Sequence, residues 1–102
     1  MAFEPVWRSA ETDMLAKALL VLRNEEDANR FLDDLCTIAE IKALGQRLAV
    51  AHLLNAETTY NAVITATGAS TTTISRVKRS LNYGADGYKR VLSRMNGEIF
   101  YE

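Results

Sequence analysis

Apolar residues recur with helical spacing along almost the whole of this 102-residue chain, and this periodicity constrains the fold more than any other feature of the sequence. Ala28, Phe31, Leu32 and Leu35, for example, stand at i, i+3, i+4 and i+7, the spacing that lines one face of a helix. A strand with one buried face would show alternating apolar and polar residues instead. The sequence therefore predicts an all-α fold.

Start and stop signals divide the chain into six predicted helices. Ser9 can cap the first helix and Asn24 the second, because both side chains can accept a hydrogen bond from a free backbone amide. Thr37 and Glu40 form a capping box, in which a hydroxyl and a carboxylate each satisfy an amide of the other residue. This box predicts the start of a long third helix that runs to Leu54.

Three shorter helices are predicted in the second half of the chain. Gly68 ends the first of them, because glycine adopts the left-handed conformation at a helix end without a steric cost. Ser70 and Asp86 can cap the other two. The predicted boundaries are Thr58 or Thr59 to Gly68 for the fourth helix, Thr71 to about Leu81 for the fifth, and Asp86 to just before Gly97 for the sixth.

Length and composition are those of one ordinary globular domain, here residues 1–102, with 48% hydrophobic and 25% charged residues. A chain this short buries only somewhat more than about 60% of its unfolded-state surface when it folds alone. We therefore expect a homodimer in which two chains share a core.

Residues 58–81 form the most informative segment, because two short predicted helices meet there at a tight turn. Val63 lies five positions before Gly68, and Ile74 and Val77 lie six and nine positions after it, so the two helices can pack across one apolar seam. This spacing predicts a helix-turn-helix, the layout that places a row of side chains in the major groove of DNA.

The outer face of the fifth predicted helix is chemically suited to double-stranded DNA. Hydroxyl groups can donate to phosphates or base edges, and an arginine can bind guanine with two hydrogen bonds. No Asp or Glu lies between Thr58 and Ala85, so no carboxylate would repel the phosphate backbone there. The side chains that this face presents are Thr71, Thr72, Thr73, Ser75, Arg76, Lys78 and Arg79.

Two other interpretations of this face remain open. A basic helix face can simply be solvated, and helix-turn-helix modules also serve as protein-interaction adaptors. The net charge of −1 conceals an asymmetry, since residues 58–94 carry six basic side chains and one acidic one, which favours a nucleic acid partner. We therefore expect double-stranded DNA to be the partner of this face.

The stretch from Thr37 to Leu81, above all its segments KALGQR and TGASTTTISR, resembles the Trp repressor superfamily. The following LNYGADGYKRVL is similar to the signature of the TrpR-related YerC/YecD-type group, so the resemblance covers about residues 31–95. It implies a six-helix, intertwined homodimer in which the fourth and fifth helices make two DNA-reading heads. It also implies a bacterial-type, sequence-specific transcriptional regulator, a repressor that reads a palindromic operator. By this resemblance the DNA-contacting residues also include Tyr60, Asn61 and Ser70.

The same resemblance implies an effector pocket. Arg47 and Arg76 match the arginines that lie on the two sides of a bound indole in Trp repressors, and Thr37 and Ser80 match residues that frame the amino acid. Val77 stands where Trp repressors use glycine, and its two methyl groups would occupy the space of the indole. We expect a filled pocket and no tryptophan corepressor; a smaller or differently shaped effector is the alternative.

No sequence pattern indicates catalysis, a metal site or a membrane partner. Cys36 and His52 are the only residues that could suggest nucleophilic or metal chemistry, and one Cys with one His does not make a ligand set. The chain starts without a signal-peptide pattern, and no apolar stretch is long enough to span a bilayer. We expect a cytoplasmic protein that is not an enzyme and holds no metal or other cofactor.

Overall fold

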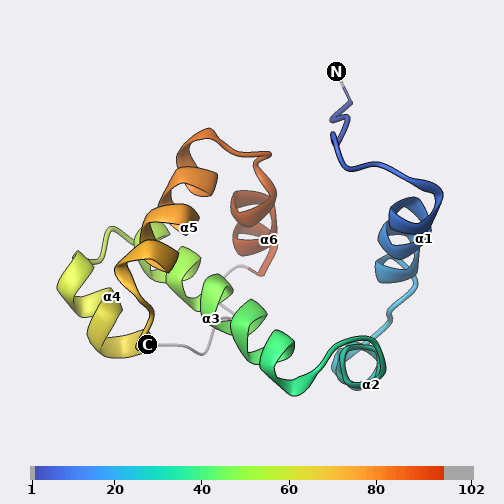
Figure 1. Cartoon of the computed structure of the whole chain (residues 1–102), viewed down its shortest axis with the longest axis horizontal. Coiled ribbons are helices and arrows are strands. Elements are labelled where there is room, and N and C mark those ends of the chain that lie inside the picture. The colour runs from blue at the N-terminus through green and yellow to red at the C-terminus, as the bar shows by residue number, and fades with distance from the viewer. Residues whose placement is uncertain (1, 96–102) are drawn as a thin grey trace. The chain divides into compact units, whose positions relative to one another are not determined.

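The computed structural model describes residues 2–95, which form six α-helices and no strand (Figure 1). The number and order of the helices agree with the sequence prediction, and the all-α fold is confirmed. The predicted end of the sixth helix near Gly97 lies outside the described residues. The helices are α1 (Ala10–Leu19), α2 (Glu25–Leu35), α3 (Ile38–Asn55), α4 (Tyr60–Thr67), α5 (Thr71–Tyr83) and α6 (Gly87–Met95).

Side-chain caps start the first three helices where the sequence predicts them. Ser9 caps α1, and the Asn24 side chain at the start of α2 accepts a hydrogen bond from a backbone amide one turn later. At α3 the capping box is formed in both directions. The Thr37 amide donates to Glu40 Oε1 at 2.8 Å, and the Glu40 amide donates to Thr37 Oγ1 at 3.1 Å. Each cap satisfies a backbone amide that has no partner within the helix.

Two details differ from the predicted elements. Helix α5 continues to Tyr83, past its predicted end near Leu81. Helix α6 begins directly after Asp86 as predicted, and the Asp86 carboxylate accepts a hydrogen bond from Arg90 Nε at 3.4 Å. The Asp86 carboxylate therefore pairs with a side chain and not with a backbone amide of the first turn, so the prediction that Asp86 caps α6 is wrong.

The capping box makes the start of α3 sensitive to acid. The Thr37 backbone N–H, and then the Thr37 hydroxyl, lower the pKa of the exposed Glu40 carboxyl below its usual 4.5. A carboxyl with a lowered pKa stabilises the folded state above the unfolded pKa, and this contribution is lost as the pH falls through the folded value. We expect the Thr37 amide proton to report this titration in an NMR pH series, with a midpoint below 4.5. Glu40→Gln should abolish the titration, and a midpoint at or above 4.5 in the unsubstituted chain would contradict the assignment.

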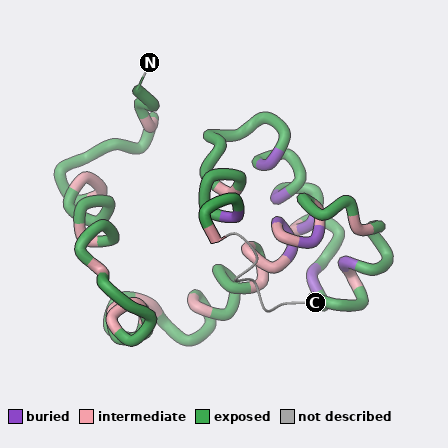
Figure 2. The backbone as a smooth tube through the Cα atoms, turned by 180° about the vertical axis from the view of Figure 1, so that it is seen from behind, coloured by how far each residue is buried: buried purple, intermediate pink, exposed green. Residues whose placement is uncertain are grey.

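The chain forms two compact units, residues 1–41 and 42–102, and α3 runs through the boundary between them. The sequence predicts one domain over residues 1–102, so the structure resolves a finer division within that range. In the N-terminal unit none of the described residues is buried, as the absence of purple along α1 and α2 in Figure 2 shows. Met14, Leu19 and Leu35 are 70%, 54% and 52% exposed, so apolar faces of α1 and α2 are uncovered in a single chain.

The C-terminal unit contains the buried core. Figure 1 shows α4, α5 and α6 lying around α3, and each of these helices contributes buried side chains. The predicted seam is confirmed, since Val63 and Ile74 are 0% exposed and Val77 is 2% exposed. Burying an aliphatic side chain of this size contributes about 1.5–3 kcal/mol, so the seam holds α4 and α5 together. The whole core comprises Val50, Ala51, Leu53, Val63, Ala69, Ile74, Val77, Leu81 and Leu92.

Candidate nucleic-acid interface

Side chains as well as glycine hold the turn between α4 and α5. Gly68 ends α4 with a φ of 68°, a left-handed conformation that is unfavourable for residues with a Cβ atom. Thr67 Oγ1 donates to the Val63 carbonyl at 2.7 Å and accepts from the Ala69 amide at 3.1 Å. Gln46 on α3 donates to the Thr67 carbonyl at 3.2 Å. These bonds fix the direction in which α5 leaves the turn.

The first turn of α5 is organised by two residues that the sequence assigns to DNA contact. Ser70 Oγ accepts from the Thr73 amide at 3.1 Å and donates to Thr73 Oγ1 at the same distance. Thr73 is half-buried, whereas Thr71 and Thr72 are exposed. Ser70 and Thr73 therefore start the helix, and Thr71 and Thr72 present their hydroxyls to the solvent side of its first turn.

The other predicted contact residues lie on the exposed surfaces of α4 and α5. The three basic residues of α5 are exposed, and within residues 2–95 none of them forms an ion pair. In contrast, Arg8, Arg30 and Arg90 are each paired with a carboxylate. A helix with positive charges that no carboxylate compensates attracts a polyanion electrostatically. The exposed predicted residues are Tyr60, Asn61, Ser70, Thr71, Thr72, Ser75, Arg76, Lys78 and Arg79.

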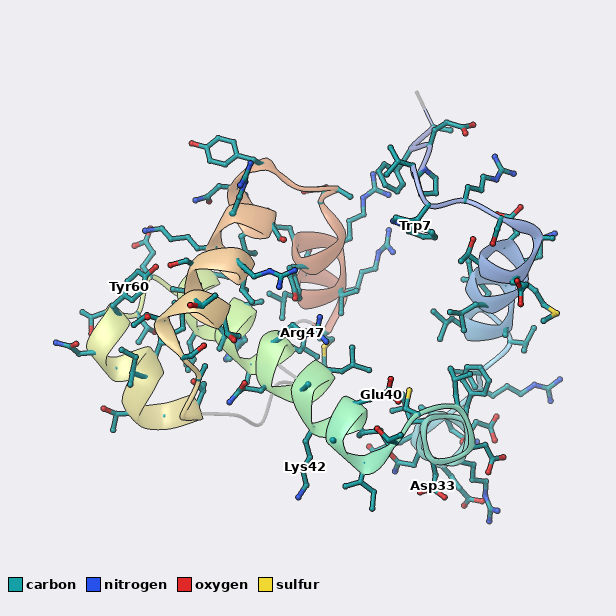
Figure 3. All side chains as sticks on the ribbon, in the orientation of Figure 1. Trp7, Asp33, Glu40, Lys42, Arg47 and Tyr60 are labelled. Carbon is teal, nitrogen blue, oxygen red and sulfur yellow. The ribbon has the colours of Figure 1, made fainter. Side chains whose placement is uncertain are left out.

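One contact joins the outer surfaces of the two helices. Tyr60, labelled on α4 in Figure 3, places its hydroxyl oxygen 3.3 Å from Ser75 Oγ on α5. Lys78 Nζ lies 5.5 Å from the centre of the Tyr60 ring, within the distance of about 6 Å at which a cation and an aromatic face attract. Tyr60 thus contacts two predicted DNA-binding residues of the neighbouring helix.

A pocket of about 370 Å³ lies between α3, α5 and α6. It brings together Arg47, Arg76, Val77 and Ser80, as the family resemblance implies, and Figure 3 labels Arg47 on α3. Val77 forms part of the wall, and open space remains beside it. Thr37 is not among the lining residues; it lies in the N-terminal unit, where it caps α3. The lining residues are Ala43, Gln46, Arg47, Thr73, Arg76, Val77, Ser80 and Tyr88.

Four lining residues were not predicted for the pocket: Ala43, Gln46, Tyr88 and Thr73, the last of which the sequence assigns to DNA contact instead. Ala43 stands four positions before Arg47, so helical spacing from Arg47 could have indicated it. Gln46 is adjacent to Arg47 in the sequence, so helical spacing from Arg47 does not indicate it. Tyr88 belongs to the apolar side of α6, and no sequence signal places that helix beside Arg47. The lining contains two guanidinium groups and no carboxylate, which suits an anionic molecule.

Some kinds of site are absent from the part of the chain that the structure describes. None of its helices combines the length and apolar content that crossing a bilayer requires. Over the same residues, no group of three or more His, Cys, Asp and Glu side chains is arranged to hold a metal ion.

Comparisons with known proteins extend over nearly the whole chain. Residues 10–96 match the family described as Trp repressor protein. The uncharacterized protein YerC of Bacillus subtilis (strain 168) is 53% identical over 88 residues, which are 86% of this chain and 85% of that protein. A crystal structure of a candidate Trp repressor from Staphylococcus aureus has a TM-score of 0.83 and 50% identity, and covers 87% of this chain and 89% of that one. A TrpR-like protein from Eubacterium eligens ATCC 27750 has a TM-score of 0.83 and 47% identity, with coverages of 88% and 93%.

Proposed function

This chain belongs to the Trp repressor family, and from this premise we propose that it is a sequence-specific, DNA-binding regulator of transcription. The resemblance read from KALGQR and TGASTTTISR, including that to the YerC group, is confirmed. The family is one of regulators, not enzymes. The observation that carries the proposal is the outer face of α5, a helix held by buried apolar residues. Arg76, Lys78 and Arg79 are exposed there and form no ion pair within residues 2–95.

The residues on this face have two different roles in DNA binding: some contact the phosphate backbone and others contact the bases. The charges of Lys78 and Arg79 attract the phosphate backbone, which gives affinity without sequence preference. Thr71 and Thr72, in the first turn of α5, can touch base edges, and Arg76 can bind guanine with two hydrogen bonds. Since the seam and the turn fix the backbone of α5, these side chains project from a helix of fixed position within the C-terminal unit.

We propose that the functional unit is a homodimer. The support is the uncovered apolar surface of α1 and α2, which include Met14, Leu19 and Leu35 but no buried residue. A second copy of the chain is the occupant that the family implies for these faces. Two such chains would present two α5 helices to successive major grooves, with half-sites about 34 Å apart. The operator is then an inverted repeat.

We propose that tryptophan is not the corepressor, because Val77 places two methyl groups where Trp repressors have only a glycine. The space of about 370 Å³ that remains beside Val77 favours a second candidate function, regulation by a different small molecule. Arg47 and Arg76 in its lining would bind a carboxylate or phosphate group of such a molecule. Bound there, it would touch α5 directly and so alter DNA binding.

Selection of bound sequences from a random DNA pool tests the proposal. The purified protein is incubated with the pool at low and near-physiological salt, with and without L-tryptophan. We expect an inverted repeat to be recovered without tryptophan, with half-sites about one helical turn apart. Enrichment only in the presence of tryptophan would contradict the blocking role of Val77. A pool that stays random under every condition would contradict DNA binding and favour the protein-interaction adaptor.

A further inference from the structure

We propose that Tyr60, Ser75 and Lys78 form one preassembled phosphate-binding cluster, in which Tyr60 is a positioning residue that holds Lys78 ready for DNA. The proposal rests on the proposed DNA-binding function and adds a division of roles within it. In the cluster, Tyr60 on α4 acts together with Ser75 and Lys78 on α5.

The backbone places the three residues at one edge of the interface. Thr59 caps α4 by accepting a hydrogen bond from the Ala62 amide at 3.3 Å, so Tyr60 is the first residue of a fixed helix. Ser75 and Lys78 are three residues apart on α5 and therefore neighbours on its surface. Tyr60 spans the gap with its hydroxyl 3.3 Å from Ser75 Oγ and its ring 5.5 Å from Lys78 Nζ.

The hydrogen-bonding capacity of the cluster is only partly used. In the pair of hydroxyls formed by Tyr60 and Ser75, one donates to the other, and the hydroxyl that accepts keeps its own hydrogen for an outside acceptor. Both side chains are exposed, and Tyr60 is 37% exposed, so an outside group can reach that hydrogen. Lys78 Nζ adds further N–H donors and a positive charge, and residues 58–85 include no carboxylate that could neutralise it.

A phosphate oxygen of the DNA backbone is the partner that this chemistry fits. It accepts hydrogen bonds from a hydroxyl and an ammonium group at once, and its negative charge pairs with Lys78. A base edge is less suited, since it carries no formal negative charge to pair with Lys78. The cluster would thus set the register of α5 on the duplex, while the neighbouring side chains read the bases.

Positioning matters because a lysine side chain is flexible and loses rotamer freedom when it binds. The Tyr60 ring restricts Lys78 before DNA arrives, so less of that freedom is lost on binding. The contribution of Lys78 to DNA affinity therefore depends on the presence of the Tyr60 ring. That dependence is a measurable coupling between residues on two different helices.

A double-mutant cycle on the full chain measures this coupling. Binding to a DNA duplex recovered by the selection is compared for the unsubstituted protein, Lys78→Met, Tyr60→Leu and the double variant over a series of salt concentrations. We expect Lys78→Met to reduce the slope of log affinity against log salt by about 0.9 for each α5 helix on the DNA. The double variant should lose less affinity than the product of the two single losses, by a factor of about five.

Matched variants separate the cluster from general effects of charge and aromatic surface. Lys89→Met removes the same charge from α6, and Tyr83→Leu removes an exposed tyrosine at the end of α5. Neither should be coupled to Lys78. Melting curves followed by circular dichroism check that each variant is folded; if Tyr60→Leu is not, Tyr60→Met removes the ring in its place in the cycle. Tyr60→Phe and Ser75→Ala test the hydroxyl pair separately. Each of these should weaken binding without changing the salt slope, because the Lys78 charge remains.

The outcomes distinguish the cluster from the function on which it rests. If the loss of DNA affinity in the double variant equals the product of the two single losses, the positioning role of Tyr60 is overturned. An unchanged salt slope in Lys78→Met would overturn the phosphate contact. If the unsubstituted protein shows no salt-dependent DNA binding, the proposed function fails, and the role of the cluster fails with it.

Discussion

Simultaneous replacement of Arg76, Lys78 and Arg79 by alanine is expected to weaken DNA binding at near-physiological salt by at least about 100-fold. The three side chains supply all the positive charge of α5, and none is needed to balance a carboxylate within the described residues. Their loss should also flatten the salt dependence, by about 0.9 for each phosphate contact removed. Affinity for unrelated DNA sequences should fall as well. Fluorescence anisotropy with labelled duplexes over a salt series provides both numbers.

A second triple variant controls for net charge. Lys89, Arg90 and Arg94 on α6 are also exposed, and their replacement by alanine removes the same formal charge from the same unit of the chain. We expect a much smaller loss of affinity for this variant, since its charges act on DNA only at longer range. DNA affinity that is unchanged by the α5 substitutions would rule out α5 as the recognition helix. It would shift the assignment to an adaptor, whose partner should respond to apolar residues instead.

Replacing Ile74 by alanine is expected to lower the free energy of unfolding by about 2–5 kcal/mol. Ile74 is 0% exposed at the centre of the core that α3, α4, α5 and α6 share, so its removal leaves a cavity that those helices can only partly close. For a small domain with a total stability of about 5–15 kcal/mol, this is a large share. Urea denaturation at one fixed protein concentration measures the change, because the stability of the proposed homodimer would depend on concentration.

A substitution at the end of the same helix provides the comparison. Tyr83 is 85% exposed, and Tyr83→Ala should change the free energy of unfolding by no more than about 0.5 kcal/mol. The contrast between the two variants isolates burial from any effect of placing alanine in α5. A loss of less than about 1 kcal/mol for Ile74→Ala would mean that the seam does not anchor α5 in the way described here.

The helices and their caps could be predicted because they depend on residues close together in the sequence. Thr37 and Glu40 lie within one helical turn, and the capping box follows from that spacing alone. The apolar seam could also be predicted, since a glycine turn of fixed length joins its two helices. It consists of Val63, Ile74 and Val77. The exposure of Arg76, Lys78 and Arg79 follows from the same periodicity, because a helix that buries one face must expose the other.

The sequence by itself thus determined the six helices, the apolar seam, the basic face of α5 and the family to which the chain belongs. Only the tertiary structure decided that Tyr60 meets Ser75, that Gln46 holds the turn at Thr67, and that Tyr88 shares a pocket with Arg47. The first two of these contacts join residues 15 and 21 positions apart. Periodicity fixes which face of a helix is apolar, but it contains no information on which other helix covers that face or on the angle between them. Those choices are made by the packing of whole helices, so the contacts that depend on them become visible only in the folded chain.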